Sequence, residues 1–326
     1  MPRIGYHCSH EQFRPSELLG YLKQAESAGF QSGMCSDHYF PWTDEQGESG
    51  YAWSWLGAAL EATKLTMGVV TVPGGWRYHP AVMAQAAATL NEMYPERFWL
   101  ATGSGEGLNE HIVGEHWPSK DERNARLLES VEIMRALWAG ETVTHRGRIR
   151  VEEAKLYTLP AKPPRVVGPA LSEATARWMG GWADALVTTA GDHESMRKIL
   201  SAFREGGGEG KPVFLQAQLA YAETDEKAVE GAWEQWRSLI LPAPVLGVLR
   251  MPVEFEGASS FVTRADVEGK IRCSSDTSRH LDWLMEFAEM GFEEINLHNV
   301  CKAGQERFIA DFGAKVLPEV PAGVVT

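Results

Sequence analysis

Cys35-Ser-Asp-His-Tyr-Phe-Pro-Trp42 and Ala101-Thr-Gly-Ser-Gly-Glu-Gly-Leu-Asn109 each follow a strand-like run and open a loop. The first stretch joins an acid, a histidine and a tryptophan, and the second places a glutamate between glycines. Parallel α/β barrels build their active sites from loops at the carboxyl ends of strands. Two such loops after two strands favour a barrel with an enzymatic site.

Strand and helix patterns alternate along the whole chain. The expected strands are 3–8, 31–36, 65–72, 97–102, 165–168, 185–189, 211–221 and 293–297. The expected helices are 15–29, 54–63, 80–93, 120–139, 172–180, 193–204, 225–239, 277–290 and 305–316. Eight strand–helix units predict an α/β fold, a TIM (β/α)8 barrel, with residues 1–326 as one domain. A doubly wound open sheet is the alternative, but no GxGxxG follows the first strand.

Three segments interrupt the alternation, and we expect insertions at about 104–120, 140–160 and 241–275. Polar and apolar residues alternate over 141–157, which predicts a hairpin. Residues 242–272 mix proline, glycine and charges and are expected to be irregular. The run Gly206-Gly-Gly-Glu-Gly210 is expected to be a plain loop.

Composition narrows the class of protein. The 326 residues carry a formal net charge of −13, which disfavours nucleic acids and anionic membranes as partners. Four cysteines without CxxC spacing suit a reducing compartment, and no run approaches a membrane span, so we expect a cytoplasmic protein with a small-molecule substrate. We expect no metal site, because no HExxH pair or Cys/His cluster occurs, and GxSxG is absent as well.

The two opening loops supply the candidate catalytic residues. His38 can exchange a proton with a substrate as a general base, or it can make a structural hydrogen bond. Trp42 can exclude water from a reacting carbon or simply anchor its loop. Glu106 can exchange a proton with a ring nitrogen, since glycines on both sides allow a ligand close approach, or it can be solvated. Asp37 can orient His38, and Asn109 can bond a ring or cap a turn.

Other segments give weaker signals. The apolar strand end Val69–Val72 reads most simply as core. The helix that opens at Leu171-Ser-Glu173 can bind an anion through its free N–H groups, although Glu173 would repel one. The chain holds twelve tryptophans, and we expect Trp42, Trp53, Trp55 and Trp76 to enclose a pocket.

Taken together, these loops resemble the luciferase-like flavin and deazaflavin oxidoreductases, and among them the sugar-phosphate dehydrogenases that use coenzyme F420. The strings that carry the resemblance are Glu11-Gln-Phe13, Ser36–Trp42, Ser54-Trp-Leu56, Arg77-Tyr-His-Pro-Ala-Val82 and Gly105–Glu110. The second half of the chain fits more loosely, through Arg177-Trp-Met-Gly180 and Ala183-Asp184.

This resemblance implies a redox ring in the barrel mouth and hydride transfer between it and a small substrate. It implies that His38 takes the hydroxyl proton, that Trp42 steadies the intermediate and that Glu106 serves the ring nitrogen. The implied cofactor-binding residues are Asp37, Val70, Thr71, Ser104, Asn109, Ala170, Leu171, Ser172 and Glu173. The implied substrate-binding residues are Glu11, Trp42, Trp76 and Thr189. A cis peptide bond is implied at Val70–Thr71, and the protein is expected to be a homodimer.

Departures from the family pattern bear on the substrate and the cofactor. Asp192 stands where the sugar-phosphate enzymes place a phosphate-binding lysine, and a second basic position falls near Lys270. We therefore expect an unphosphorylated alcohol, sugar or carbonyl compound. The cofactor is expected to be FMN or coenzyme F420, with FMN preferred because the chain is acidic and Glu173 stands at the phosphate loop. The alternatives are an FMN-dependent monooxygenase that uses oxygen and a non-catalytic flavin-binding protein.

Overall fold

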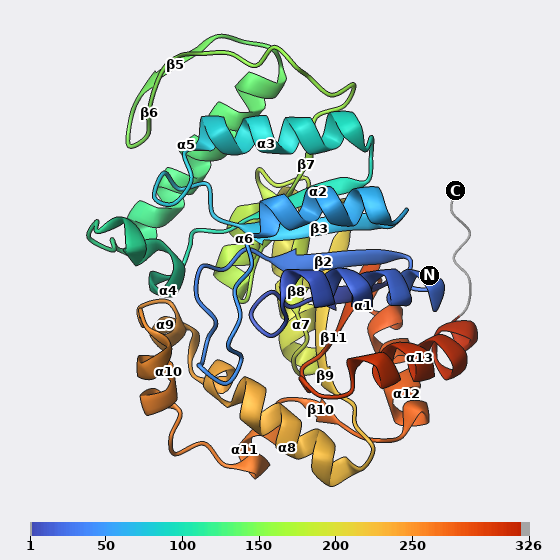
Figure 1. Cartoon of the computed structure of the whole chain (residues 1–326). Coiled ribbons are helices and arrows are strands. Elements are labelled where there is room, and N and C mark those ends of the chain that lie inside the picture. The colour runs from blue at the N-terminus through green and yellow to red at the C-terminus, as the bar shows by residue number, and fades with distance from the viewer. Residues whose placement is uncertain (1, 321–326) are drawn as a thin grey trace.

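The computed structural model describes residues 2–320 and shows a closed barrel of eight parallel strands (Figure 1). The barrel strands are β1 (Arg3–Cys8), β2 (Ser32–Ser36), β3 (Thr66–Thr71), β4 (Phe98–Thr102), β7 (Arg165–Pro169), β8 (Ala185–Thr189), β9 (Val213–Ala220) and β11 (Glu294–Asn299). Each strand pairs with its neighbour in that order, and β11 pairs with β1 to close the ring. The predicted TIM barrel is thereby confirmed.

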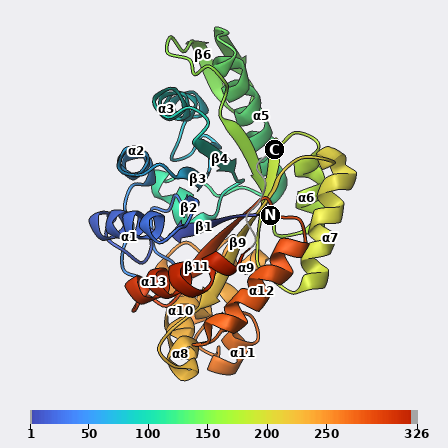
Figure 2. The same cartoon turned by 90° about the vertical axis from the view of Figure 1, so that its right-hand side faces the viewer.

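Within residues 2–320, nine helices of eight or more residues surround the barrel (Figures 1 and 2). They are α1 (Pro15–Ser27), α2 (Ala52–Ala62), α3 (Pro80–Met93), α5 (Lys120–Trp138), α6 (Glu173–Gly180), α7 (His193–Phe203), α8 (Asp225–Trp236), α12 (Thr277–Glu289) and α13 (Gln305–Lys315). Capping side chains begin several of them: Ser119, Asp192 and Thr224 each accept a hydrogen bond from the third backbone N–H of α5, α7 and α8. All nine predicted helices are present, with ends that differ by a few residues.

Alternation along the strands sends one set of side chains outward and the other inward. The outward set packs against the helices in the main core. The inward set includes Met34, Trp99 and Phe214, which form a separate buried cluster. A side chain at Gly68 would collide with the Trp99 indole, so the glycine makes room for that ring. The filled interior leaves the carboxyl ends of the strands as the place for a site.

The interruptions of the pattern are ordered. After β4 come α4 (Gly107–Glu110) and a 3₁₀ turn, η1 (His111–Val113), and the predicted hairpin is confirmed as β5 (Val143–Arg146) with β6 (Arg150–Ala154). The prediction that residues 242–272 are irregular is wrong, because they form short helices and a strand. These elements are α9 (Ala243–Leu246), α10 (Pro252–Ala258), α11 (Arg264–Glu268) and β10 (Arg272–Cys273), after the 3₁₀ turn η3 (Arg237–Ile240). Pro244 and Pro252 stand in the first turns of α9 and α10, where proline favours a helix start.

The glycine run after α7 is also more than a loop. Residues Arg204–Gly208 form one π-helical turn, η2, that extends α7 against α6. A side chain at Gly206 would overlap the backbone of Arg177, and one at Gly180 would overlap the carbonyl of Phe203. The glycines therefore let two helices approach at backbone distance, which a reading of glycine as a loop signal misses.

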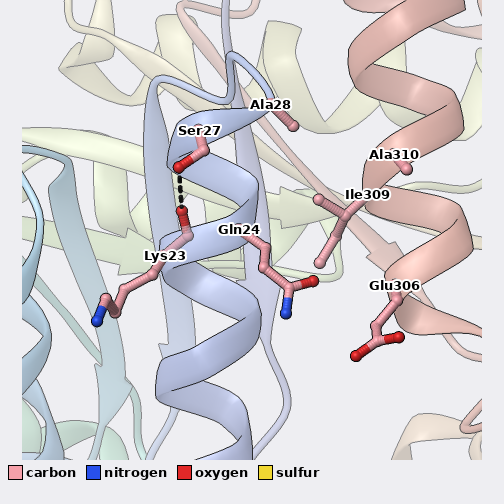
Figure 3. A pocket seen from close by; sticks show the side chains of 7 residues that line it. All are labelled: Lys23, Gln24, Ser27, Ala28, Glu306, Ile309 and Ala310. Carbon is pink, nitrogen blue, oxygen red and sulfur yellow. Dashed lines mark hydrogen bonds between the residues drawn. The ribbon is translucent and has the colours of Figure 1, made fainter.

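A groove of about 420 Å³ lies on the outer wall between α1 and α13 (Figure 3). Its lining includes Lys23 and Gln24 from α1 and Glu306 and Ile309 from α13. No predicted site residue lines it. Among the helices of residues 2–320, none is both long and apolar enough to cross a membrane.

We predict that Gly206→Ala lowers the free energy of unfolding by about 1–3 kcal/mol, because its methyl group collides with the α6 backbone. The matched control is Gly20→Ala in α1, where an added methyl group meets nothing within 4 Å. That change should raise stability by about 0.5–1 kcal/mol. Urea unfolding of both variants measures the difference, and a Gly206→Ala protein as stable as the wild type would show that the helices are not in such close contact.

Candidate active site

The predicted catalytic residues converge at the carboxyl ends of β1, β2 and β4. His38 follows β2, and its Nε2 atom lies 3.5 Å from Oε1 of Glu11, which follows β1. The His38 and Trp42 rings are 5.0 Å apart between centroids. Glu106 follows β4, close enough for the charge of His38 to lower its pKa. The loops after β1 and β2 therefore meet at one imidazole, and the loop after β4 lies in its neighbourhood.

The hydrogen bonds of His38 determine which nitrogen can act as a base. Its Nδ1 atom lies 3.3 Å from the carbonyl oxygen of Phe40, which can only accept. Nδ1 therefore carries the proton in that bond, and Nε2 is the basic nitrogen of the neutral ring. Nε2 faces Glu11, whose other oxygen accepts a hydrogen bond from Ser9 at 3.0 Å. A proton on Nε2 therefore has a carboxylate partner. Because Glu11 is buried, water weakens this interaction little.

Glu106 stands at the N-cap of α4 but makes no capping bond through its side chain. Burial raises the pKa of its carboxyl above the ordinary value, and the nearby charges of His38 and Arg123 lower it again. A carboxyl group held in this way keeps its proton to higher pH than a solvated glutamate. It can therefore act as a proton donor as well as an acceptor.

A buried ion network holds these loops together. The Arg77 side chain is 6% exposed and lies between Asp37, after β2, and Glu110, in α4. Its guanidinium donates to the backbone oxygen of Asp37 at 2.8 Å and to Oε1 of Glu110 at 3.0 Å. The backbone N–H of Arg77 donates to the other Glu110 oxygen at 3.1 Å. One side chain from the β3–α3 loop thus connects the His38 loop to the Glu106 loop.

Several residues expected to bind the cofactor ring form hydrogen bonds within the protein. Asp37 accepts hydrogen bonds from the hydroxyl groups of Thr71, at 2.9 Å, and Tyr78, at 3.0 Å. The side-chain oxygen of Asn109 accepts from the backbone N–H of Tyr39 at 2.8 Å. These bonds fix the loop that carries His38. A contact of Asp37, Thr71 or Asn109 with a cofactor stays a prediction.

The cis bond expected at Val70–Thr71 is wrong, because residues 2–320 contain no cis peptide bond. The strand β3 stays regular through Thr71, which lies opposite Thr102. The carbonyl of Val70 accepts from the N–H of Asp37, and that of Thr71 accepts from Gly103, at 2.9 and 2.8 Å. The ladder therefore uses both carbonyls in the ordinary trans arrangement.

The expected phosphate loop lies beside the β4 loop. Ala101 in β4 pairs opposite Val167 in β7, and Gly103 lies against Pro169, so a continuation of this register would place Ser104 beside Ala170. Both Ser104 and Ala170 are buried, whereas Leu171, Ser172 and Glu173 are exposed. The Ser172 hydroxyl caps α6 by accepting from Thr175. These residues follow the carboxyl ends of β4 and β7, and their contact with a cofactor stays a prediction.

An apolar cover lies over Trp42. Its indole packs edge-on against Phe255 of α10 at 5.3 Å between centroids, and Leu108 lies in the same buried cluster. Partly buried side chains border this cluster: Phe40, Leu239, Leu246 and Leu249. Glu256 accepts a hydrogen bond from the backbone N–H of Asp44 at 2.8 Å. The insertion after α8 therefore closes over the loop that carries Trp42.

The prediction that four tryptophans enclose one pocket is wrong. Trp53 and Trp55 belong to α2 and lie in the main core, and the Trp55 indole donates to the carbonyl of Pro15. Trp76 is buried against Trp117, with ring centroids 5.0 Å apart. Trp42 lies in a different cluster from all of these. The other expected substrate residue, Thr189, ends β8 and is half-buried at the barrel mouth.

Sequence reasoning missed Arg77, Glu110 and Phe255. Arg77 and Glu110 lie inside strings that carry the family resemblance, so their pairing had a signal that we did not use. Phe255 lies in the segment expected to be irregular and gave none. Across residues 2–320, no group of three or more His, Cys, Asp or Glu side chains is placed to hold a metal ion.

Comparison with known proteins agrees with this geometry. The profile of the luciferase-like monooxygenase family matches residues 1–294. The F420-dependent glucose-6-phosphate dehydrogenase of Nakamurella multipartita is 33% identical over 330 residues, which cover 98% of this chain and 97% of that protein. The enzyme of the same name from Intrasporangium calvum is 34% identical over 331 residues and 98% of both chains.

A solved structure is also similar over the whole length. It is an F420-dependent secondary alcohol dehydrogenase in complex with an F420-acetone adduct, with a TM-score of 0.90 and 30% identity over 99% of this chain and all of that one. A coenzyme F420-dependent reductase from Methanopyrus kandleri shares the fold at 18% identity and a TM-score of 0.77. The chain belongs to the luciferase-like monooxygenase family. The preference for FMN is not supported, since the curated relatives and the first of these structures are named for F420.

We predict that Arg77→Met lowers the free energy of unfolding by about 3–5 kcal/mol, because Asp37 and Glu110 are left buried without a cation. Arg146→Ala, which removes a salt bridge between side chains 67% and 72% exposed, is the control and should cost less than about 1 kcal/mol. Denaturant unfolding of both variants measures the difference. Equal stability of the two variants would show that the ion network of Arg77, Asp37 and Glu110 does not stabilise the fold.

The same variant should show a pH signature. Burial already raises the pKa of Glu110 above its ordinary 4.5, and the Arg77 charge lowers it, so the variant's Glu110 pKa rises further. A carboxyl whose folded pKa exceeds its unfolded pKa binds more protons when folded, so stability falls as pH rises through that interval. The deficit of Arg77→Met should therefore grow as pH rises above 4.5. Unfolding curves that show a deficit independent of pH would contradict this.

Proposed function

We propose that this protein is an oxidoreductase that transfers a hydride between coenzyme F420 and a small unphosphorylated alcohol or carbonyl compound. The observation that carries the proposal is the meeting of His38, Glu11, Trp42 and Glu106 at one end of the barrel. A protein that only stores a cofactor needs no such acid–base set. The relatives and the similar solved structure, all named as F420-dependent dehydrogenases, support the same chemistry.

The side chains divide the work of proton transfer. Nε2 of His38 accepts the hydroxyl proton of an alcohol, and the Glu11 carboxylate stabilises the imidazolium that results. Trp42 and Phe255 exclude water from the reacting carbon. Glu106 holds or releases a proton from the loop after β4. The deazaflavin, when bound, supplies the two-electron hydride acceptor.

The residues present fit such a cofactor. Glu106 offers an uncommitted carboxyl whose pKa is raised by burial, as a ring nitrogen partner requires. Gly105 adopts a left-handed conformation with φ of 86°, and a side chain there would collide with the Trp117 indole, so the glycine lets this loop pack closely against Trp117. Ser104 and Ala170 form the adjoining edge. We expect the ring to lie between these loops and His38.

The cover over Trp42 favours an unphosphorylated substrate. Besides its contact with His38, the indole lies in a cluster that includes the apolar side chains Phe255, Leu246 and Leu249. Asp192, where sugar-phosphate enzymes carry a lysine, caps α7 by accepting from the N–H of Ser195 at 2.9 Å and adds negative charge. A phosphate would find an aspartate where it needs a cation. A small alcohol or ketone fits better.

We predict that His38→Asn lowers turnover by a factor of about 10²–10⁴, the usual contribution of a general base. Cofactor affinity should stay close to that of the wild type. His116→Asn, at an exposed position of the β4–α5 connection, is the control and should leave turnover unchanged. Steady-state reduction of F420 by a panel of alcohols measures both. Undiminished turnover of His38→Asn would remove His38 from the mechanism.

A second prediction concerns pH. If Glu106 donates a proton during alcohol oxidation, the rate should fall as pH rises through its pKa, which burial places above 4.5. Glu106→Gln should lower the rate and abolish this decrease, while Glu106→Asp should keep it. Rate profiles of the three proteins provide the measurement. An unchanged profile in Glu106→Gln would assign the titration to another group.

Titration of the purified protein with F420 and with FMN tests the cofactor itself. F420 should bind, with a shift of its single violet absorption band, and FMN should bind more weakly. Tighter binding of FMN would overturn the proposed cofactor and favour a flavin-dependent reaction. The homodimer and the cytoplasmic location stay predictions.

A further inference from the structure

Two cations near the β4 loop have no carboxylate partner. Lys120 and Arg123, in the first turn of α5, form no salt bridge within residues 2–320. By contrast, Arg77 is paired with Asp37 and Glu110, and Arg126 lies 3.5 Å from Glu122. Arg123 is 8% exposed; its Nη1 atom donates to the carbonyl oxygen of Pro118 at 3.1 Å and its guanidinium lies 4.8 Å over the Trp117 ring, but its Nε atom is buried without a hydrogen-bond acceptor. Burial of an unpaired charge is costly, so an anion at this place would stabilise the fold.

The ammonium group of Lys120 lies against the proposed cofactor site. Its Nζ atom is 3.1 Å from the hydroxyl of Ser104, which is 8% exposed at the end of β4. Lys120 as a whole is an exposed residue, so a ligand can reach its side chain from solvent. Desolvation and the charge of Arg123 lower the pKa of Lys120, whereas Glu106 raises it. The carboxyl of Glu106 offsets only part of the positive charge, because burial favours its protonated form.

The neighbouring loop cannot provide this charge. The register of β4 and β7 would place Ser104 beside Ala170, and the residues that follow, Leu171 to Glu173, include no cation and one acid. The overall charge of −13 gives no general attraction for a phosphate. Lysine at the first position of a helix is itself unfavourable toward the helix dipole. An anion there would interact with Lys120 and with the positive end of α5 together.

We propose that Lys120, with Ser104 beside it and Arg123 behind it, binds the phosphate group of the cofactor at the edge shared by β4 and β7. This inference rests on the proposed function, since it requires a phosphate-bearing redox cofactor in the barrel mouth. It adds a cation from the start of α5 to a phosphate loop whose own residues carry none. It also explains how an acidic chain with Glu173 at that loop holds a polyanion.

Binding titrations of Lys120→Gln test this assignment. The ligands are F420 and its phosphate-free deazaflavin riboside, and the quenching of tryptophan fluorescence reports binding. Lys120→Gln should raise the Kd for F420 about tenfold or more and leave that for the riboside within about twofold. Lys120→Arg should retain most of the affinity, and Lys23→Gln, in the outer groove of Figure 3, should bind both ligands like the wild type.

Other outcomes would overturn the assignment. It fails if Lys120→Gln binds F420 as tightly as the wild type, or if the riboside and F420 lose affinity equally. It also fails if only the KM of the substrate changes, because the anion would then belong to the substrate. If the wild type prefers FMN, the same series with FMN and riboflavin tests Lys120, and only the proposed cofactor is lost.

Discussion

The buried guanidinium of Arg77 is the interaction on which the rest of the site depends. It bonds Asp37 and Glu110, both nearly inaccessible to water, and so joins the loops after β2, β3 and β4. None of the three charges is tolerable alone in that environment, so the loops hold one another in register. His38 and Glu106 are attached to the two ends of this network. Their spacing follows from the bonds of Arg77.

Two surfaces of different character meet above this network. One is polar and includes Glu11, His38 and Glu106, where protons can be exchanged. The other is the apolar cover that the insertion after α8 places over Trp42 through Phe255. A hydride moves between carbons most readily where water is excluded and a base is near. The barrel supplies the base from its strand ends, and the insertion excludes the water.

The sequence predicted the barrel because alternating strands and amphipathic helices are local patterns. It also predicted that the loops carrying His38, Trp42 and Glu106 lie at the carboxyl ends of strands, whereas the catalytic roles of these residues stay predictions. It did not predict the ion network of Arg77, because Glu110 is distant from Arg77 in sequence and becomes its partner only in the folded chain. Trp53 and Trp55 were predicted to line a pocket but lie in the main core, since composition does not say which face of α2 is buried. The preference for FMN came from the acidic chain and Glu173, and it did not consider Lys120, whose ammonium group lies 3.1 Å from the Ser104 hydroxyl.

The most direct test of hydride transfer at this site measures the transfer of deuterium from an alcohol to the cofactor. The protein is incubated without oxygen with F420 and a secondary alcohol that carries deuterium on its carbinol carbon, and the cofactor is examined by mass spectrometry. The account predicts that one deuterium appears in the reduced cofactor and that the alcohol becomes a ketone. Reduced cofactor without deuterium, or no reduction with any alcohol while F420 is bound, would contradict hydride transfer at this site.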